Sequence, residues 1–187
     1  DLLNEGMRAS LDGFSKPALA LSGGLDSSLA LTAWCDVRGK EAPLDTFTIC
    51  PEPDWDGRTA PHRFGDERPH VEALLEHYPA IRPHWLDTRG LALDDKLDAI
   101  IMMSHGAPRN AMHVQWSAAL HDAAKDQGCD VLIMASFSNF TLSFDGDGML
   151  PSLMRSGRWR TLAREINAVK GANSFARTWM ARAVMPL

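Results

Sequence analysis

The 187-residue sequence contains only three cysteines, Cys35, Cys50 and Cys129, which lie far apart and form no CxxC pair. This distribution argues against a structural zinc site or a disulfide framework, and it is typical of a protein in a reducing cytoplasm. The sequence also lacks an apolar run long enough to span a bilayer, and no signal peptide opens it. We therefore expect a cytoplasmic protein with no membrane partner.

Positive charge is in the minority, and the formal net charge is −5. The composition therefore gives no indication of a nucleic-acid partner. The charge is unevenly distributed, because residues 151–187 contain seven lysines and arginines and only one acidic residue, Glu165. Such a stretch has two interpretations, a solvated helical face or a surface that binds phosphates or an acidic substrate.

Several well-known ligand-binding motifs are absent. The sequence has no GxxxxGK[ST] phosphate loop, no GxGxxG after a strand and no HExxH. A Walker-type loop, a dinucleotide fingerprint and a zincin-type metal site are therefore excluded. Asp145 and Asp147 are spaced like the start of a calcium loop, but Ser156 stands where that loop requires a bidentate Glu. Either aspartate remains an alternative source of a magnesium ligand.

What is present is a regular alternation of short apolar runs and longer amphipathic segments. Residues 17–22, 44–50, 81–86 and 130–135 are predicted strands, and residues 26–37, 67–77, 93–104 and 111–126 are predicted helices. The alternation predicts an α/β fold with a doubly wound parallel sheet. Residues 150–184 show no strand pattern and predict a helical C-terminal extension. Residues 51–66, rich in Pro, Gly and Asp, predict a mobile loop beside the ligand site.

The sequence SGGLDSS, residues 22–28, joins the first predicted strand to the first predicted helix. Ligands of open parallel sheets bind at this end of the strands. Gly23 and Gly24 allow a close approach of the backbone to a ligand, and the following helix N-terminus attracts an anion. Asp26 suits a phosphate only if a cation such as Mg²⁺ lies between them. The alternative is an ordinary strand–turn–helix in which Asp or Ser caps the helix.

These seven residues resemble the pyrophosphate loop of the N-type ATP pyrophosphatases, the PP-loop family, whose fold is adenine nucleotide alpha hydrolase-like. Members of this family split ATP between the α and β phosphates and adenylate a substrate. The resemblance implies ATP and Mg²⁺ as cofactors, with Asp26 as a catalytic residue and metal ligand. It implies that Ser22, Gly23, Gly24, Leu25, Asp26, Ser27 and Ser28 bind the cofactor.

Two further segments resemble asparagine synthetases. Residues 65–87 are similar to the segment in which an acidic pair opens a helix, and residues 108–136 are similar to the helix and strand that follow. The first similarity implies a catalytic role for Glu67, whereas the residues alone also allow Asp66 and Glu67 to cap the helix. Asn110, in the second segment, is a weaker cofactor-binding candidate.

The sequence departs from asparagine synthetases at Asn139, where they place an Asp that holds Mg²⁺ and pyrophosphate. Because an amide is a poorer magnesium ligand than a carboxylate, we expect Asn139 to bind the cofactor by donating to pyrophosphate. The loop around Asn139 resembles that of lasso-peptide cyclases, the macrolactam synthetases, which join a peptide's N-terminal amine to an Asp or Glu side chain. Residues 157–165 are also similar to that branch.

The resemblance implies an ATP-dependent carbon–nitrogen ligase that forms an acyl-adenylate, releases pyrophosphate and makes an amide. Its partner is a small-molecule or peptide carboxylate, and a precursor peptide in the macrolactam case. The alternatives are an asparagine synthetase that hydrolyses glutamine and a degenerate nucleotide-binding domain without catalysis. We expect residues 1–187 to be one synthetase domain of a longer chain, with a glutaminase-like domain, a C-terminal part and the family's catalytic lysine outside it.

Overall fold

The computed structural model describes residues 2–60, 64–92, 95–104, 111–135 and 148–168. Asn110 and Asn139, two of the predicted cofactor-binding residues, lie outside the described residues, as do Asp145 and Asp147. The chain divides into two compact units, Asp1–Ser136 and Phe137–Leu187. In the described part of the chain, no helix is long and apolar enough to cross a membrane.

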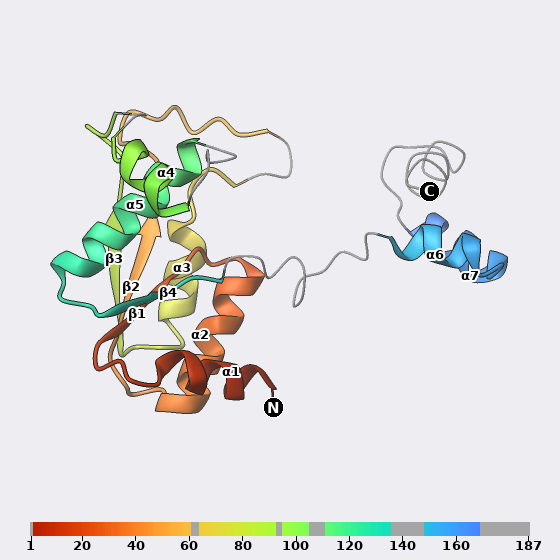
Figure 1. The fold of residues 1–187 in the computed structure, drawn as a ribbon, viewed down its shortest axis with the longest axis horizontal. Coiled ribbons are helices and arrows are strands. Elements are labelled where there is room, and N and C mark those ends of the chain that lie inside the picture. Colours follow the sequence, from red (N-terminus) through yellow and green to blue (C-terminus); the bar gives the residue numbers. More distant parts are fainter. Residues whose placement is uncertain (1, 61–63, 93–94, 105–110, 136–147, 169–187) are drawn as a thin grey trace. The chain divides into compact units, whose positions relative to one another are not determined.

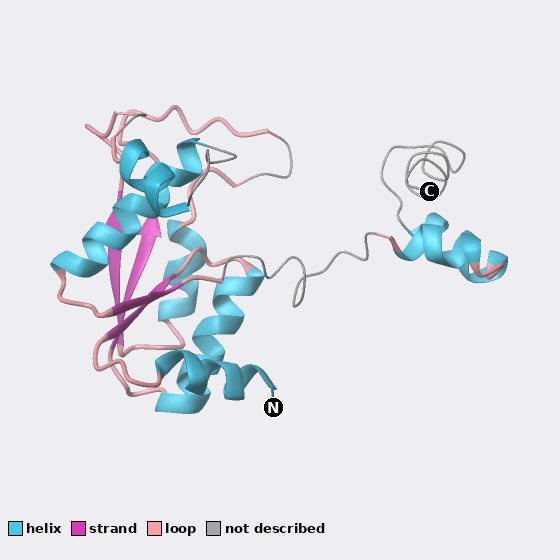
Figure 2. Cartoon of the chain, in the orientation of Figure 1, coloured by secondary structure: helices cyan, strands magenta, loops and turns pink. Residues whose placement is uncertain are grey.

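The first unit is built on a four-stranded parallel sheet in the order β3-β2-β1-β4 (Figures 1 and 2). The strands are β1 (Pro17–Ala20), β2 (Leu44–Ile49), β3 (Ile81–Leu86) and β4 (Val131–Ile133). All four lie inside the predicted strand segments, and the prediction of a parallel α/β sheet is confirmed. The chain runs outward from β1 to β3 and then crosses to β4 on the other side of β1. The strand order therefore switches direction between β1 and β4.

Among the described residues of the first unit, five helices accompany the sheet. They are α1 (Leu2–Leu11), α2 (Leu25–Arg38), α3 (Arg68–Leu75), α4 (Leu97–Ser104) and α5 (Ala111–Asp126). The four helices predicted for this region are present, whereas α1 was not predicted. The described part of residues 51–66 contains neither helix nor strand, as its Pro- and Gly-rich composition predicted.

Each face of the sheet packs into its own hydrophobic cluster. Leu19 of β1 and Leu44 of β2 pack with residues of α1, α2 and α3. Ala18 and Phe47, from the same two strands, pack instead with Leu120 of α5. Neighbouring residues of a strand point to opposite faces, so one short strand contributes to both clusters. The sheet is thus covered by helices on both faces, which is compatible with a doubly wound fold.

A polar contact closes the amino end of the sheet. The Asp130 carboxylate, just before β4, accepts hydrogen bonds from the backbone N–H of Ser15 at 2.6 Å and of Lys16 at 3.0 Å. The Ser15 hydroxyl donates to the same carboxylate at 2.8 Å. These bonds lower the Asp130 pKa, with the Ser15 N–H as the largest cause. They fix the segment that enters β1 against the segment that enters β4.

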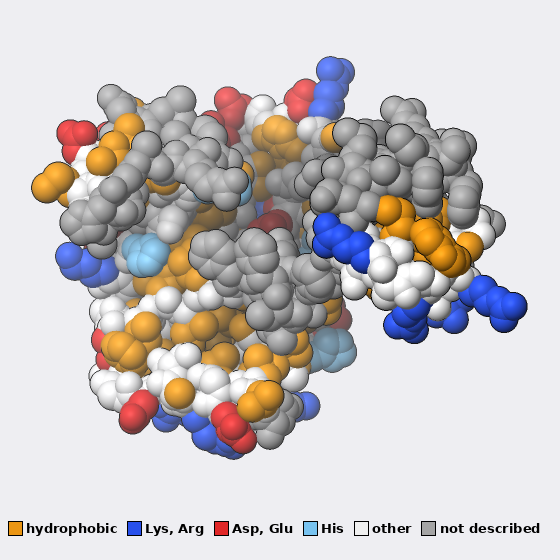
Figure 3. All heavy atoms as spheres, turned by 45° about the vertical axis from the view of Figure 1, so that its right-hand side comes forward, with side chains coloured by type: hydrophobic (Ala, Val, Ile, Leu, Met, Phe, Trp, Pro, Cys, Tyr) orange, Lys and Arg blue, Asp and Glu red, His pale blue; other side chains and the backbone are white. Residues whose placement is uncertain are grey.

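The second unit contains α6 (Met149–Arg155) and α7 (Trp159–Ala168). Leu150 and Leu153 of α6 pack against Leu162 and Ile166 of α7 to form a small apolar cluster. The arginines of these two helices are exposed, and Figure 3 shows basic side chains beside apolar surface on this unit. Within residues 148–168 the predicted helical character is therefore present, and the basic side chains of this part are solvent-exposed.

Candidate functional site

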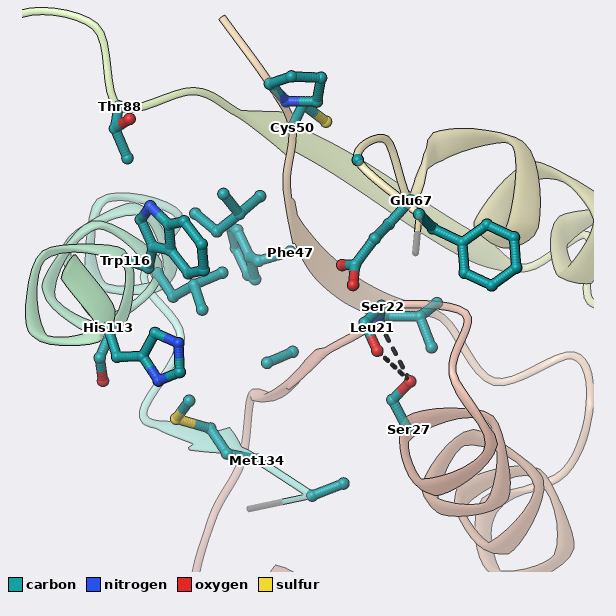
Figure 4. A pocket seen from close by; sticks show the side chains of 18 of the residues that line it. Leu21, Ser22, Ser27, Phe47, Cys50, Glu67, Thr88, His113, Trp116 and Met134 are labelled. Atoms are coloured by element: carbon teal, nitrogen blue, oxygen red, sulfur yellow. Dashed lines mark hydrogen bonds between the residues drawn. The ribbon is translucent and has the colours of Figure 1, made fainter. Parts of the chain in front are cut away.

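A cavity of about 910 Å³ lies at the carboxyl edge of the sheet, and all of its lining residues belong to the first unit. Its walls come from the segments that follow β1, β2, β3 and β4, from α5, and from the loop at residues 51–65 (Figure 4). Open parallel sheets bind ligands at this edge, beside the point where the strand order switches direction. The volume falls within the range of small-molecule and cofactor sites.

The SGGLDSS loop forms one side of the cavity and is held by its own serines. The hydroxyl oxygens of Ser22 and Ser27 lie 2.9 Å apart, and the Ser22 N–H donates to Ser27 Oγ at 3.2 Å. The Gly24 N–H donates to Ser22 Oγ at 3.3 Å. The turn is therefore fixed by short-range bonds, and Ser22, Asp26 and Ser27 line the cavity.

Gly24 is the N-cap of α2, and no side chain caps this helix through a hydrogen bond. The first N–H groups of a helix have no partner within the helix, and they carry the positive end of its dipole. With Ser22 and Ser27 beside them, these groups form a polar half of the cavity that suits an anion. The alternative that a side chain of this loop merely caps the helix has no support in the structure.

Gly23 is required by two features of the turn. Its φ is +68°, in the left-handed region that favours glycine. An added Cβ would lie 2.5 Å from His70 Cβ and 3.0 Å from the His70 backbone carbon. The loop after β1 thus passes directly against the first turn of α3, which brings Glu67 to the same cavity.

Glu67 lies beside Ser22, on the side of the cavity across from His113 and Trp116, and Figure 4 shows its carboxylate pointing into the cavity. Its burial raises the pKa of this carboxyl, and the negative charge of Asp66 raises it further. Asp66 itself bonds Arg68, with 2.7 Å between its Oδ2 and Arg68 Nη2, and this hydrogen bond lowers the Asp66 pKa. The acidic pair is therefore divided between two roles: Asp66 fixes the start of α3, while Glu67 faces the cavity without capping the helix.

The other half of the cavity is apolar and aromatic. Phe47 of β2 and Met134 after β4 lie on one wall, with His113 and Trp116 of α5 beside them (Figure 4). The His113 and Trp116 rings are stacked, with 5.4 Å between centroids and 24° between planes. Ala20, the last residue of β1, lines the cavity among these larger side chains. Because its side chain is one methyl group, space remains above β1.

Residues 51–59 and 64–65 supply the rim next to the polar half. Trp55, Arg58 and Phe64 line the cavity there. A Cβ added at Gly65 would collide with the Trp55 ring, so these two parts of the loop pack on each other. The loop thus borders the cavity, and its place beside an ATP site stays a prediction.

The structure brings together four of the predicted site residues, namely Ser22, Asp26, Ser27 and Glu67, around one cavity. Gly23 and Gly24 shape the turn behind them. Leu25 is 71% exposed, and neither Leu25 nor Ser28 lines the cavity. Leu25 begins α2, so its backbone N–H belongs to the free first turn, whereas the Ser28 N–H donates to the Gly24 carbonyl at 3.0 Å and is not available to a ligand.

Sequence reasoning missed the apolar half of the site. Phe47 and Ala20 were assigned to strands without a functional role, and His113 and Trp116 to the body of a helix. Their shared feature is position, because each lies near the end of an element at the carboxyl edge of the sheet. Strand ends in a βαβ pattern are a signal that sequence does contain, but it does not show which residues of α5 face inward.

Among the described residues, no group of three or more His, Cys, Asp or Glu side chains is placed to hold a metal ion. A Mg²⁺ ion held by one or two carboxylates and by phosphate oxygens needs no such cage. Asp26, partly buried and on the polar wall, fits that second arrangement.

No protein-family model matches this chain. No curated protein matches it either. Its function is therefore argued from the geometry of the cavity.

Proposed function

We propose that this chain is an ATP-dependent carbon–nitrogen ligase of the PP-loop class, with an adenine nucleotide alpha hydrolase-like fold. The observation that carries the proposal is the serine-rich turn at residues 22–28. It combines hydroxyls, an uncapped helix N-terminus and a partly buried carboxylate at the carboxyl edge of a parallel sheet. This combination supports binding of a pyrophosphate group better than binding of a neutral ligand.

The polar half of the cavity accounts for the phosphates. Ser22 and Ser27 provide hydroxyl donors, and the N-terminus of α2 provides backbone donors. Asp26 would hold Mg²⁺ between its carboxylate and the phosphate oxygens. When bound, the ion would neutralise charge on the pyrophosphate leaving group. The residues themselves orient the phosphate chain along the polar wall and keep it in place.

The apolar half accounts for the base and sugar. A purine is flat and apolar on its faces, and it stacks on aromatic rings. Phe47, Trp116 and His113 supply such rings, and the small side chain of Ala20 leaves room for the base over β1. One cavity thus offers both a slot for adenine and a turn for the phosphates.

The proposed chemistry has two steps. A substrate carboxylate oxygen attacks the α-phosphorus of ATP, the bond to the bridging oxygen breaks, and pyrophosphate leaves. An amine nitrogen then attacks the acyl carbon, AMP leaves with the carboxylate oxygen, and the amine loses a proton. Glu67 faces this region, and its raised pKa makes it a stronger base than an exposed Glu. We assign it to holding the amine and accepting that proton.

The rim of the cavity favours a large carboxylate substrate. Trp55 and Phe64 place aromatic side chains there, with the Arg58 guanidinium beside them. A peptide that closes an amide with its own Asp or Glu side chain would contact this rim, as in macrolactam closure of a lasso peptide. Free aspartate, the substrate of the asparagine synthetase alternative, has no apolar part for these aromatic side chains to bind.

ATP–pyrophosphate exchange tests the proposal. The purified chain, alone and with its partner domains, is incubated with ATP, Mg²⁺, labelled pyrophosphate and either aspartate or an acidic peptide. Exchange that needs the carboxylate supports the ligase, and a preference for the peptide supports macrolactam closure. ATP binding without exchange in the complete protein would favour the degenerate nucleotide-binding domain, and absence of ATP binding would overturn the proposal.

A further inference from the structure

A buried carboxylate with three basic neighbours lies on the same face of the sheet as the apolar half of the cavity. Asp45 of β2 is 6% exposed and faces the α5 side of the sheet. His84 Nε2 lies 2.9 Å from its Oδ1, Arg82 Nε lies 3.5 Å from the same oxygen, and Lys16 Nζ lies 3.9 Å from Oδ2. Burying a carboxylate costs free energy that such partners offset, often without a net gain in stability. The partners of Asp45 therefore do not by themselves explain why a carboxylate is buried at this position.

The strand register connects this cluster to the cavity. Asp45 pairs with Arg82 of β3, and two residues further along Phe47 pairs with His84. Both residue pairs lie on the same face of the sheet because side chains alternate along a strand, so residues two positions apart share a face. His84 thus stands beside Phe47 and reaches back along the sheet to Asp45.

His84 packs flat against Phe47. The ring centroids are 4.7 Å apart, and the planes differ by 14°. Ala20 is the partner of Phe47 on β1, so a methyl group stands where another large side chain would otherwise support the ring. His84 is therefore the aromatic neighbour that fixes the tilt of Phe47, and the Asp45 carboxylate fixes the orientation of His84.

We propose that the buried Asp45–His84 pair positions Phe47 as the wall of the base-binding half of the cavity, and that His84 is thereby a positioning residue for ATP. The inference rests on the proposed function and adds a residue outside the cavity to it. Removing the His84 ring lets Phe47 tilt towards β3, which widens the slot for the base. The polar half, on the opposite wall, keeps its geometry.

The test measures the affinities of MgATP and of inorganic pyrophosphate with Mg²⁺ by calorimetry on the same protein. For His84→Ala we expect ATP affinity to fall by about five- to tenfold, the scale of one lost aromatic pair. Affinity for pyrophosphate stays unchanged because it needs only the polar half. His84→Phe restores ATP affinity since it keeps a ring against Phe47, although it leaves Asp45 with one partner fewer.

Ile81→Ala is the matched control. Ile81 lies on the same strand, packs into the cluster on the other face, and lines no part of the cavity. It should lower the melting temperature and leave both affinities unchanged. If His84→Ala does not fold, His84→Leu fills the space without a flat ring and must show the same selective loss of ATP affinity.

The outcomes separate this proposal from the proposed function. Wild-type protein that binds neither ATP nor pyrophosphate overturns both. Wild-type binding with equal losses of ATP and pyrophosphate affinity in His84→Ala overturns the positioning role alone. Failure of His84→Phe to restore ATP affinity, or an unchanged ATP affinity in His84→Ala, overturns it equally.

Discussion

Gly23 passes so close to His70 that a Cβ on the glycine would lie 2.5 Å from the Cβ of the histidine. This approach joins the loop after β1 to the start of α3. It brings Ser22 and Glu67 together at one cavity, although they are 45 positions apart in the sequence. This close approach therefore adds to the serine hydrogen bonds that hold the polar half of the cavity.

Gly23→Ala should therefore destabilise the protein by more than the backbone strain alone. Placing a residue with a Cβ at φ +68° costs about 1 kcal/mol or more, and the clash with His70 adds to it. Gly13→Ala is the matched control, because Gly13 has φ +81° and nothing within 4 Å of the added Cβ. Urea unfolding of both variants measures the difference, and equal losses would show that the His70 contact is unimportant.

Asp26→Ala in the complete protein should depress ATP–pyrophosphate exchange by about 10²-fold or more, the scale on which a lost charge stabiliser acts. Asp26→Asn should behave almost as badly, since an amide is a poor ligand for Mg²⁺. Asp36, an exposed residue of the same helix, gives the control variant Asp36→Asn. Exchange at the wild-type rate in Asp26→Ala would remove Asp26 from the metal site.

Ala20→Leu should close the slot for the base. The larger side chain projects into the cavity among Phe47 and Met134, so it fills space that adenine needs. We expect ATP affinity to fall by about tenfold or more while pyrophosphate binds normally, since one misplaced methylene group already costs an apolar pocket about 1–3 kcal/mol. Ala42→Leu, in the turn before β2, is the control. Unchanged ATP binding in Ala20→Leu would place the base elsewhere.

Glu67→Gln should separate stability from activity as the pH changes. Burial raises the Glu67 pKa in the folded chain above its ordinary value of 4.5. A carboxyl with a raised pKa favours folding below its ordinary pKa, and that contribution is lost as the pH rises through the folded pKa. The variant should therefore gain stability over wild type as the pH rises through that window, and match it at lower pH.

The rate of amide formation by Glu67→Gln should fall, because proton transfer by a positioned base contributes about 10²-fold or more to the rate. Melting curves from pH 4 upward and amide formation at neutral pH check the two halves on one protein. A variant that is as active as wild type would show that Glu67 is not the base. A stability difference independent of pH would show that burial does not perturb this carboxyl.

Most of the architecture could be read from the sequence because buried parallel strands appear as short apolar runs. The first and last residues of some elements could not be read from the sequence. The helix predicted from residue 93 begins only at Leu97, since Lys96 has φ +60°, which is incompatible with a helix and unusual for lysine. Helix α1 was missed because few of its residues are buried, Met7 and Leu11 being two that are.

Some residues of the candidate site could likewise be predicted from the sequence, and others could not. Ser22, Asp26 and Ser27 could be predicted because one local turn carries them all. Phe47 and His113 could not, because the apolar wall exists only after β2 and α5 have packed together. Similarly, the role of Asp66 was ambiguous until its bond to Arg68 showed which acid of the pair remains available in the cavity.

The bonds from Ser15 and Lys16 to Asp130 have a consequence for synthesis on the ribosome. These partners are more than a hundred residues apart in the chain, so the central strand waits for almost the whole first unit to emerge before one of its edges is paired. Contacts of such long range slow folding. Met134 follows immediately behind β4 and lines the cavity, so the cavity of a nascent chain is incomplete before this last strand has joined the sheet.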